Sequence, residues 1–267
     1  MLPTLLALDF DGVLCDGLIE YFQTAWKAYC EVFEPTSLAP PMGLAERFYP
    51  LRPMVETGWE MPLVLYGLLT GVAEGDILDH WPTLVPQLLA QAGVESAQLG
   101  AAVDGVRDRW IAADLKEWLG LHRFYPGVLP RLQQAQAEGV ELVIISTKEG
   151  RFIQQLLAQQ GLELAANRIL GKEIKQPKYE TLRQLIRLAG QASHAMPEIW
   201  FVEDRIKALQ MVQAQPDLDT VQLFLADWGY NTAADRAIAQ TDDHLRLLSL
   251  IQFAQPFDDW LTSGEES

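Results

Sequence analysis

The chain has few of the features that mark disulfide-rich, membrane-spanning or secreted proteins. It has two cysteines among 267 residues, and neither Cys15 nor Cys30 has a cysteine or histidine partner at metal-ligand spacing. We therefore predict reduced thiols. The longest apolar run, residues 61–72, is too short to cross a bilayer. No basic stretch precedes the N-terminal apolar run, which Asp9 interrupts, so we expect a cytoplasmic protein with no membrane partner.

Positive charge is also scarce. The chain has 20 Lys and Arg against 36 Asp and Glu, which gives a net charge of -16. Such a chain repels polyanions, so we predict no nucleic-acid partner. A small phosphate ester is still compatible, because a metal ion and a local lysine can supply positive charge. The sequence carries no signal for an oligomeric state.

Short apolar runs alternate with amphipathic stretches in the second half of the chain. The runs at 140–145, 199–202 and 221–226 predict strands, and the stretches between them have helical spacing. Residues 4–9 form a similar run that ends in an acid. This alternation is typical of a parallel sheet with helices on both faces. We therefore predict an α/β fold with a Rossmann-like, three-layer parallel sheet.

The region between the first two predicted strands has no strand-like run. Helical spacing of apolar residues occurs at 18–33 and near 63–72, 76–92 and 96–119. We therefore predict that residues 17–122 are an all-helical insertion in a sheet domain formed by 1–16 and 123–254. Residues 255–267 are predicted to be a C-terminal tail, whose acidic part, 256–267, is expected to be frayed.

Each of three predicted strands ends in polar side chains. They are Asp9 and Asp11, Ser146 and Thr147, and Glu203 and Asp204. In open parallel sheets, ligands bind beyond the carboxyl ends of the strands, and carboxylates and hydroxyls suit metal ions and phosphate. Any one pair alone is explained by a turn or a helix N-cap. Three pairs in this order favour a functional site.

These motifs resemble those of the haloacid dehalogenase superfamily over nearly the whole chain. The segment DFDGV at 9–13 is similar to that family's D-x-D-G-[TV], and VED at 202–204 is similar to its acidic fourth motif. Ser146 stands where the second motif has Ser or Thr, and the following Thr147-Lys148 resembles the run of phosphoglycolate-phosphatase-like members. The resemblance implies a helical cap at 17–122.

The resemblance also implies a role for each motif residue. Asp9 would attack phosphorus and become an aspartyl phosphate. Asp11 would protonate the leaving alcohol and then deprotonate water. Ser146 would hydrogen-bond the phosphoryl group. The ligands of Mg²⁺ would be the Asp9 carboxylate, the Asp11 backbone carbonyl and Asp204. Glu203 would be either a further ligand or a residue that contacts the ligands without touching the ion.

The third motif of the family supplies a lysine, and here its position is ambiguous. Many members read Lys-Pro-x-Pro, but Gln176 precedes Pro177 in this chain. Lys178 begins a predicted helix, as the motif lysine does in other members, and we prefer it. Lys175 is the second candidate. If Lys175 is not the motif lysine, we expect it to contact the substrate.

We therefore predict Mg²⁺-dependent hydrolysis of a small phosphate monoester, by a phosphatase that acts on a phosphorylated metabolite. Asp11 favours a phosphate ester over a dehalogenase substrate, because an alkoxide leaving group needs a proton. Thr147 and Arg52 are candidate substrate contacts, and Arg52 could instead be a surface arginine. Two alternatives stay open: a phosphomutase similar to β-phosphoglucomutase, and a non-catalytic binding protein on this fold.

Overall fold

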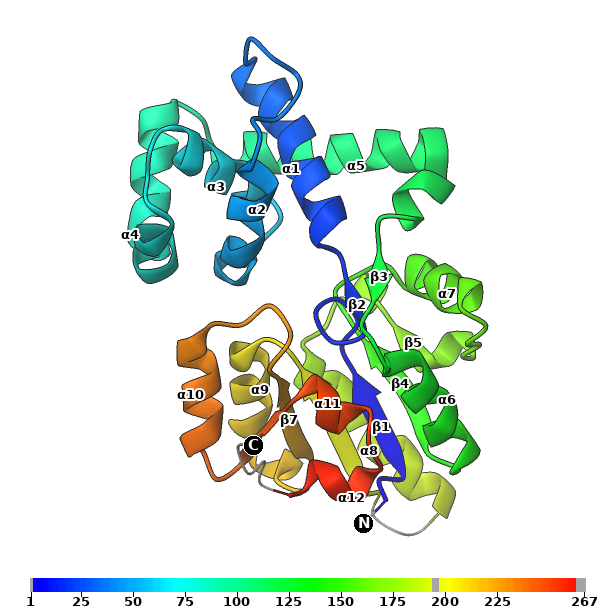
Figure 1. The fold of residues 1–267 in the computed structure, drawn as a ribbon. Coiled ribbons are helices and arrows are strands. Elements are labelled where there is room, and N and C mark those ends of the chain that lie inside the picture. Colours follow the sequence, from blue (N-terminus) through cyan, green and yellow to red (C-terminus); the bar gives the residue numbers. More distant parts are fainter. Residues whose placement is uncertain (1, 194–196, 263–267) are drawn as a thin grey trace. The chain divides into compact units, whose positions relative to one another are not determined.

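The chain forms two compact units in the computed structural model, which describes residues 2–193 and 197–262. One unit consists of Met1–Asp16 and Arg123–Ser267, and the other of Gly17–His122. Figure 1 shows the first unit as a sheet between helices and the second as helices alone.

The first unit is built on a six-stranded sheet in the order β5-β4-β1-β6-β7-β8. Its strands are β1 (Leu5–Leu8), β4 (Glu141–Ile145), β5 (Ile169–Leu170), β6 (Ile199–Glu203), β7 (Gln222–Ala226) and β8 (Leu245–Leu248). All neighbouring strands are parallel. The predicted α/β fold is therefore confirmed. The sequence analysis missed the edge strands β5 and β8. β5 has only two residues and β8 is half-exposed, so neither forms a recognisable apolar run.

Helices cover both faces of this sheet. They are α6 (Val128–Ala137), α7 (Gly150–Gln159), α8 (Lys178–Ser193), α9 (Ile206–Gln213), α10 (Ala233–Thr241), α11 (Leu250–Phe253) and α12 (Phe257–Trp260). Successive strand side chains point to opposite faces. Leu5 and Ala7 of β1 accordingly pack in a core with α8, α9 and α10, and Trp200 of β6 lies on the other face with α12. A short antiparallel pair, β2 (Cys15–Asp16) and β3 (Arg123–Phe124), completes the unit.

The C-terminal segment corrects one prediction. Residues 256–262 were expected to be frayed, but Phe257 and Trp260 of α12 are each 2% exposed. Their rings lie 5.4 and 5.7 Å from that of Trp200. Burial of large aromatic rings outweighs the cost of ordering this acidic segment. Residues 263–267 of the predicted tail lie outside the described residues.

The second unit is helical. It contains α1 (Leu18–Phe33), α2 (Leu44–Phe48), the 3-10 turn η1 (Tyr49–Met54), α3 (Glu60–Leu69), α4 (Glu74–Ala92) and α5 (Ser96–Leu119). Glu20 of α1 is buried and accepts hydrogen bonds from Arg107 at 2.8 and 3.0 Å and from the Trp118 indole at 3.1 Å. This partly buried ion pair ties α1 to α5. Within the described part of the chain, no helix combines the length and apolar character needed to cross a membrane.

Candidate active site

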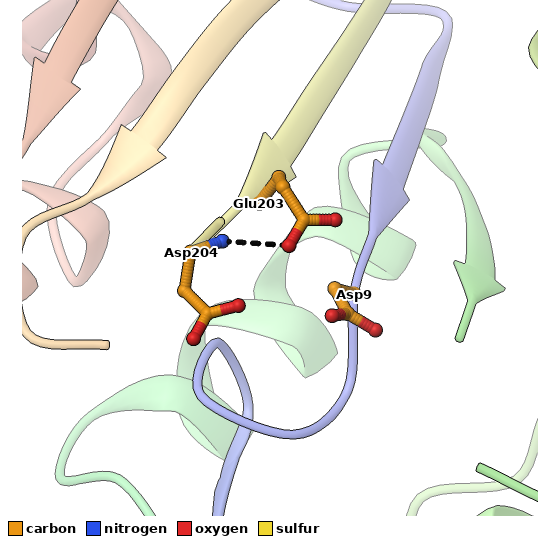
Figure 2. A group of neighbouring side chains, drawn as sticks. All are labelled: Asp9, Glu203 and Asp204. Atoms are coloured by element: carbon orange, nitrogen blue, oxygen red, sulfur yellow. Dashed lines mark hydrogen bonds between the residues drawn. The ribbon is translucent and has the colours of Figure 1, made fainter. Parts of the chain in front are cut away.

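Three buried carboxylates meet at the carboxyl ends of β1 and β6. Asp9 directly follows β1, while Glu203 ends β6 and Asp204 comes next. The two strands are paired in parallel with Leu8 opposite Val202, so their ends coincide. One carboxylate oxygen from each residue lies within 4.8 Å of the others. Figure 2 shows the carboxylates of Glu203 and Asp204 at the end of β6, beside that of Asp9.

Lys178, the first residue of α8, reaches two of these carboxylates. Its Nζ lies 2.9 Å from Oδ2 of Asp9 and donates a 2.5 Å hydrogen bond to Oε2 of Glu203. Lys175, by contrast, is exposed and occupies a left-handed backbone conformation with φ of 51°. The structure therefore brings Lys178, and not Lys175, to the nucleophile predicted from the sequence.

Glu203 is fully buried and has hydrogen-bond donors at both carboxylate oxygens. Oε2 accepts from Lys178, while Oε1 accepts from the backbone N–H groups of Asp204 at 3.1 Å and Arg205 at 3.0 Å. Figure 2 shows the first of these backbone bonds. Because its oxygens are occupied in this way, Glu203 is placed to hold the lysine.

The loop after β7 fixes Asp204. The N–H of Tyr230 donates to Oδ2 of Asp204 at 2.7 Å, and the Asn231 amide donates to its backbone carbonyl at 3.1 Å. Two glycines permit this close approach: a Cβ on Gly12 would lie 2.1 Å from Asp204 Oδ2, and one on Gly229 would lie 2.2 Å from Asp204 Cβ. Gly12 also has φ of +86°, which disfavours other residues. The sequence analysis had no signal for these distant contacts.

Asp11 is paired with a lysine that the sequence analysis left without a role. Nζ of Lys148 lies 3.2 and 3.4 Å from the two carboxylate oxygens of Asp11. Lys148 follows β4, the strand that pairs with the other side of β1, and its N–H donates to the buried Ser146 hydroxyl at 3.3 Å. Thr147, between them, is exposed. The signal for Lys148 was its place two residues after Ser146 at a strand end.

Arg52 lies in η1 of the helical unit, where it has partners. Its Nη1 donates to the Val55 carbonyl at 3.0 Å, and its guanidinium lies 4.7 Å from the centre of the Tyr21 ring. Val55 and Tyr21 belong to the same unit as Arg52.

Burial and like charge shift the pKa values of the site. The pKa of Asp9 is raised to about 6, mainly by burial. The charge of Lys178 opposes this rise, and the charge of Glu203 adds to it. The pKa of Asp204 is raised by burial and by the charge of Asp9, and that of Glu203 is raised mainly by burial. Burial lowers the pKa of Lys178, but its two carboxylate partners raise it above the ordinary value. The site therefore favours the charged form of the lysine and disfavours the charged forms of the carboxylates.

This donor set fits a divalent cation. Asp9, Glu203 and Asp204 bring three carboxylates together, and the single ammonium of Lys178 contacts two of them. Burial, and after it the like charge of a neighbouring carboxylate, raises the pKa of each of the three, and a cation would favour their ionised forms. Clustered carboxylate oxygens suit hard divalent cations. The described residues thus include one acidic group that could hold such an ion.

Comparison with known proteins agrees with this geometry. Residues 3–214 match the model of the haloacid dehalogenase-like hydrolases. The chain belongs to this family. The resemblance inferred from the motifs is thereby confirmed, and so is the prediction of a hydrolase. No curated protein matches this sequence.

Solved structures share the fold at low sequence identity. A predicted phosphatase from Clostridium acetobutylicum is 16% identical, with a TM-score of 0.54, over 95% of this chain and 97% of that one. A predicted phosphoglycolate phosphatase from Haemophilus somnus is 17% identical, with a TM-score of 0.54, over 91% and 92%. At such identity the likeness establishes the shared fold.

Proposed function

We propose that the protein is a Mg²⁺-dependent phosphatase that hydrolyses a small phosphate monoester through Asp9. The observation that carries this proposal is the bridge that Lys178 makes between Asp9 and Glu203 beside Asp204. It joins a nucleophile, a fixed positive charge and a cation site at one sheet edge. The similar structures described as phosphatases support the same reaction.

In the first step Asp9 replaces the leaving alcohol on phosphorus. A carboxylate oxygen of Asp9 attacks in line as the bond from phosphorus to the ester oxygen breaks. The electron pair stays on the ester oxygen, which takes the proton of Asp11. The Phe10 N–H donates to Oδ1 of Asp9 at 2.7 Å, and Lys178 lies at Oδ2, so the carboxylate has a fixed orientation. Ser146 donates its hydroxyl proton to a phosphoryl oxygen.

In the second step water hydrolyses the aspartyl phosphate. Asp11, now ionised, takes a proton from the water as its oxygen bonds to phosphorus. The bond between phosphorus and the Asp9 oxygen breaks, and its electron pair restores the carboxylate. Inorganic phosphate leaves, and Asp11 again carries the proton that the next turnover needs.

Asp9, Asp204 and the backbone carbonyl of Asp11 would hold the Mg²⁺ ion. When bound, the ion supplies positive charge that offsets the negative charge of the phosphoryl oxygens. Glu203 keeps Lys178 in place, because its oxygens already accept three hydrogen bonds. An ammonium that is held before substrate arrives costs no reorganisation during the reaction.

We assign the helical unit, Gly17–His122, the role of a cap that excludes water and selects the substrate. Thr147 and Arg52 are the substrate contacts we propose, the first at the strand end and the second in the cap. The substrate would be a phosphorylated metabolite of the cytoplasm.

The proposal is tested by assaying p-nitrophenyl phosphate and a panel of phosphorylated metabolites with Mg²⁺. The wild-type protein is expected to release phosphate from at least one of them. The Asp9→Asn variant is the control, because it keeps the shape of the side chain and loses the nucleophile. Phosphate release that is no faster in the wild type than in Asp9→Asn would contradict the proposal.

A further inference from the structure

Tyr230, in the loop after β7, joins two parts of the chain that lie far apart in the sequence. Its N–H donates to Oδ2 of Asp204 at 2.7 Å, and its hydroxyl donates to Oδ1 of Asp16 at 3.0 Å. The residue is 5% exposed. One buried tyrosine therefore contacts a proposed ligand of the cation through its backbone and a second carboxylate through its side chain.

Further contacts hold this loop from both sides. Nη1 of Arg205 donates to the Tyr230 carbonyl at 2.8 Å. The Trp228 indole donates to the carbonyl of Val13, in the turn after β1, at 3.1 Å. A Cβ on Gly12, in the same turn, would lie 3.0 Å from Cδ2 of the Tyr230 ring, so the ring packs directly on this turn. The loop is thus clamped between the segment after β6 and the segment after β1.

Asp16 lies in the connection between the two units. It ends β2, pairs with Arg123 of β3, and is the last residue before the helical unit, Gly17–His122. A hydrogen bond from a hydroxyl to a carboxylate is stronger than one between neutral groups. The bond from Tyr230 therefore joins the loop that contacts Asp204 firmly to the chain that leads into the helical unit.

The affinity of a metal site depends on the groups that hydrogen-bond its ligands and so fix their orientation. The Tyr230 N–H can do this for Asp204 only while the loop keeps its place. We propose that Tyr230 is a positioning residue of the cation site: the bond from its hydroxyl to Asp16 holds the loop, and the loop holds Asp204. This inference rests on the proposed function, in which Asp204 is a ligand of Mg²⁺.

The test measures the Kd for Mg²⁺ in the absence of substrate, by calorimetric titration of the full chain. In Tyr230→Phe the Kd should rise about tenfold, the low end of the effect of changing a partner of a metal ligand, because the N–H itself remains. Tyr29→Phe is the matched control. This half-buried tyrosine of α1 packs on Trp26 and Phe33, so the Kd should stay as in the wild type.

Two substitutions of Asp16 separate the hydrogen bond from the charge. Asp16→Asn keeps an oxygen that can accept the bond and loses the charge, whereas Asp16→Ala loses both. We expect Asp16→Asn to stay close to the wild type and Asp16→Ala to match Tyr230→Phe. The last of these also removes a hydrogen bond between Tyr230 and Tyr125, which the Asp16 variants retain. Combining Asp16→Ala with Tyr230→Phe should weaken binding no further than either change alone, because both remove one bond.

An unchanged Kd in Tyr230→Phe would overturn the inference and leave the proposed function standing. Equal weakening in Asp16→Asn and Asp16→Ala would overturn it too, because the charge of Asp16, and not the bond, would then act on the ion. Losses that add up in the double variant would show that the two residues act separately, which also contradicts the inference. A wild type that binds no Mg²⁺ would instead count against the cation site of the proposed function, and the inference would fall with it.

Discussion

Nζ of Lys178 lies 2.9 Å from Oδ2 of Asp9, the residue proposed to attack phosphorus. Burial raises the pKa of this carboxylate to about 6, and the adjacent lysine works against that shift. Asp9 must be ionised to act as a nucleophile. Lys178 therefore does two things in our account: it keeps Asp9 charged, and it neutralises the phosphoryl oxygens.

Replacing Lys178 should remove most of the activity. We expect Lys178→Met to lower kcat/KM by about 10²- to 10³-fold, the loss typical of one charge-stabilising group in an active site. Lys175→Met, three residues away and exposed, should retain most of the activity. Steady-state kinetics with p-nitrophenyl phosphate would decide between the two lysines. A larger loss in Lys175→Met would reverse our assignment.

The part of the site that could be predicted from the sequence lies at the strand ends. Asp9, Asp11, Ser146 and Asp204 each follow or end a run whose pattern is local, so their convergence follows from parallel pairing. Lys178 was identified as the better of two candidates. Local sequence patterns can therefore identify the residues of a site when these residues stand at strand ends that meet at one edge of the sheet.

Long-range contacts could not be predicted in this way. The pairing of Lys148 with Asp11 joins loops that are 137 residues apart, and the bond from the Tyr230 N–H to Asp204 depends on how two loops pack. Neither leaves a periodic signal. The same holds for Trp260, which packs against Trp200. The acidic residues near Trp260 in the sequence led to the prediction of a frayed tail.

Glu203 and Asp204 are neighbours with different proposed roles, and their variants should differ accordingly. In Asp204→Asn the Mg²⁺ concentration for half-maximal activity should rise by at least about tenfold, because a ligand loses its charge. In Glu203→Gln that concentration should change little, while kcat falls by about 10- to 100-fold, because Lys178 loses a charged partner. Mg²⁺ titrations of activity measure both. A strong Mg²⁺ effect in Glu203→Gln would make it a direct ligand.

The stabilisation that Mg²⁺ confers should grow with pH. The pKa of Asp9 is about 6 in the folded chain against an ordinary value of 3.8, so the unfolded chain loses this proton first. Without metal, the contribution of Asp9 to the free energy of unfolding is therefore present below pH ~4 and is lost as pH rises through ~6. A cation binds the ionised carboxylates and reverses this loss.

Thermal unfolding with and without Mg²⁺ between pH 5 and pH 7.5 checks this linkage. The difference in Tm should increase over that range in the wild type and increase less in Asp9→Asn. A difference in Tm that is the same at every pH would mean that metal binding is not coupled to these carboxylates.

Two glycines with nearly the same φ angle give a matched test of the packing around Asp204. Gly12 has φ of +86° and Gly139 has φ of +84°, so alanine is strained to a similar degree at both, by about 1 kcal/mol. Only at Gly12 would the new Cβ meet the site, 2.1 Å from Asp204 Oδ2; at Gly139, among the described residues other than its two chain neighbours, none has an atom within 4 Å of it. Gly12→Ala should abolish Mg²⁺-dependent activity, and Gly139→Ala should only lower Tm. Equal kinetics in the two variants would show that the close approach is not needed.

The central claim is that Asp9 carries the phosphoryl group during turnover. Its most direct test is to quench the enzyme while it hydrolyses substrate, reduce acyl phosphates with borohydride, and map the peptides by mass spectrometry. The account predicts that the aspartate at position 9 is converted to homoserine, and that this product is missing without substrate. Conversion at another position, or none while the enzyme is turning over substrate, would contradict it.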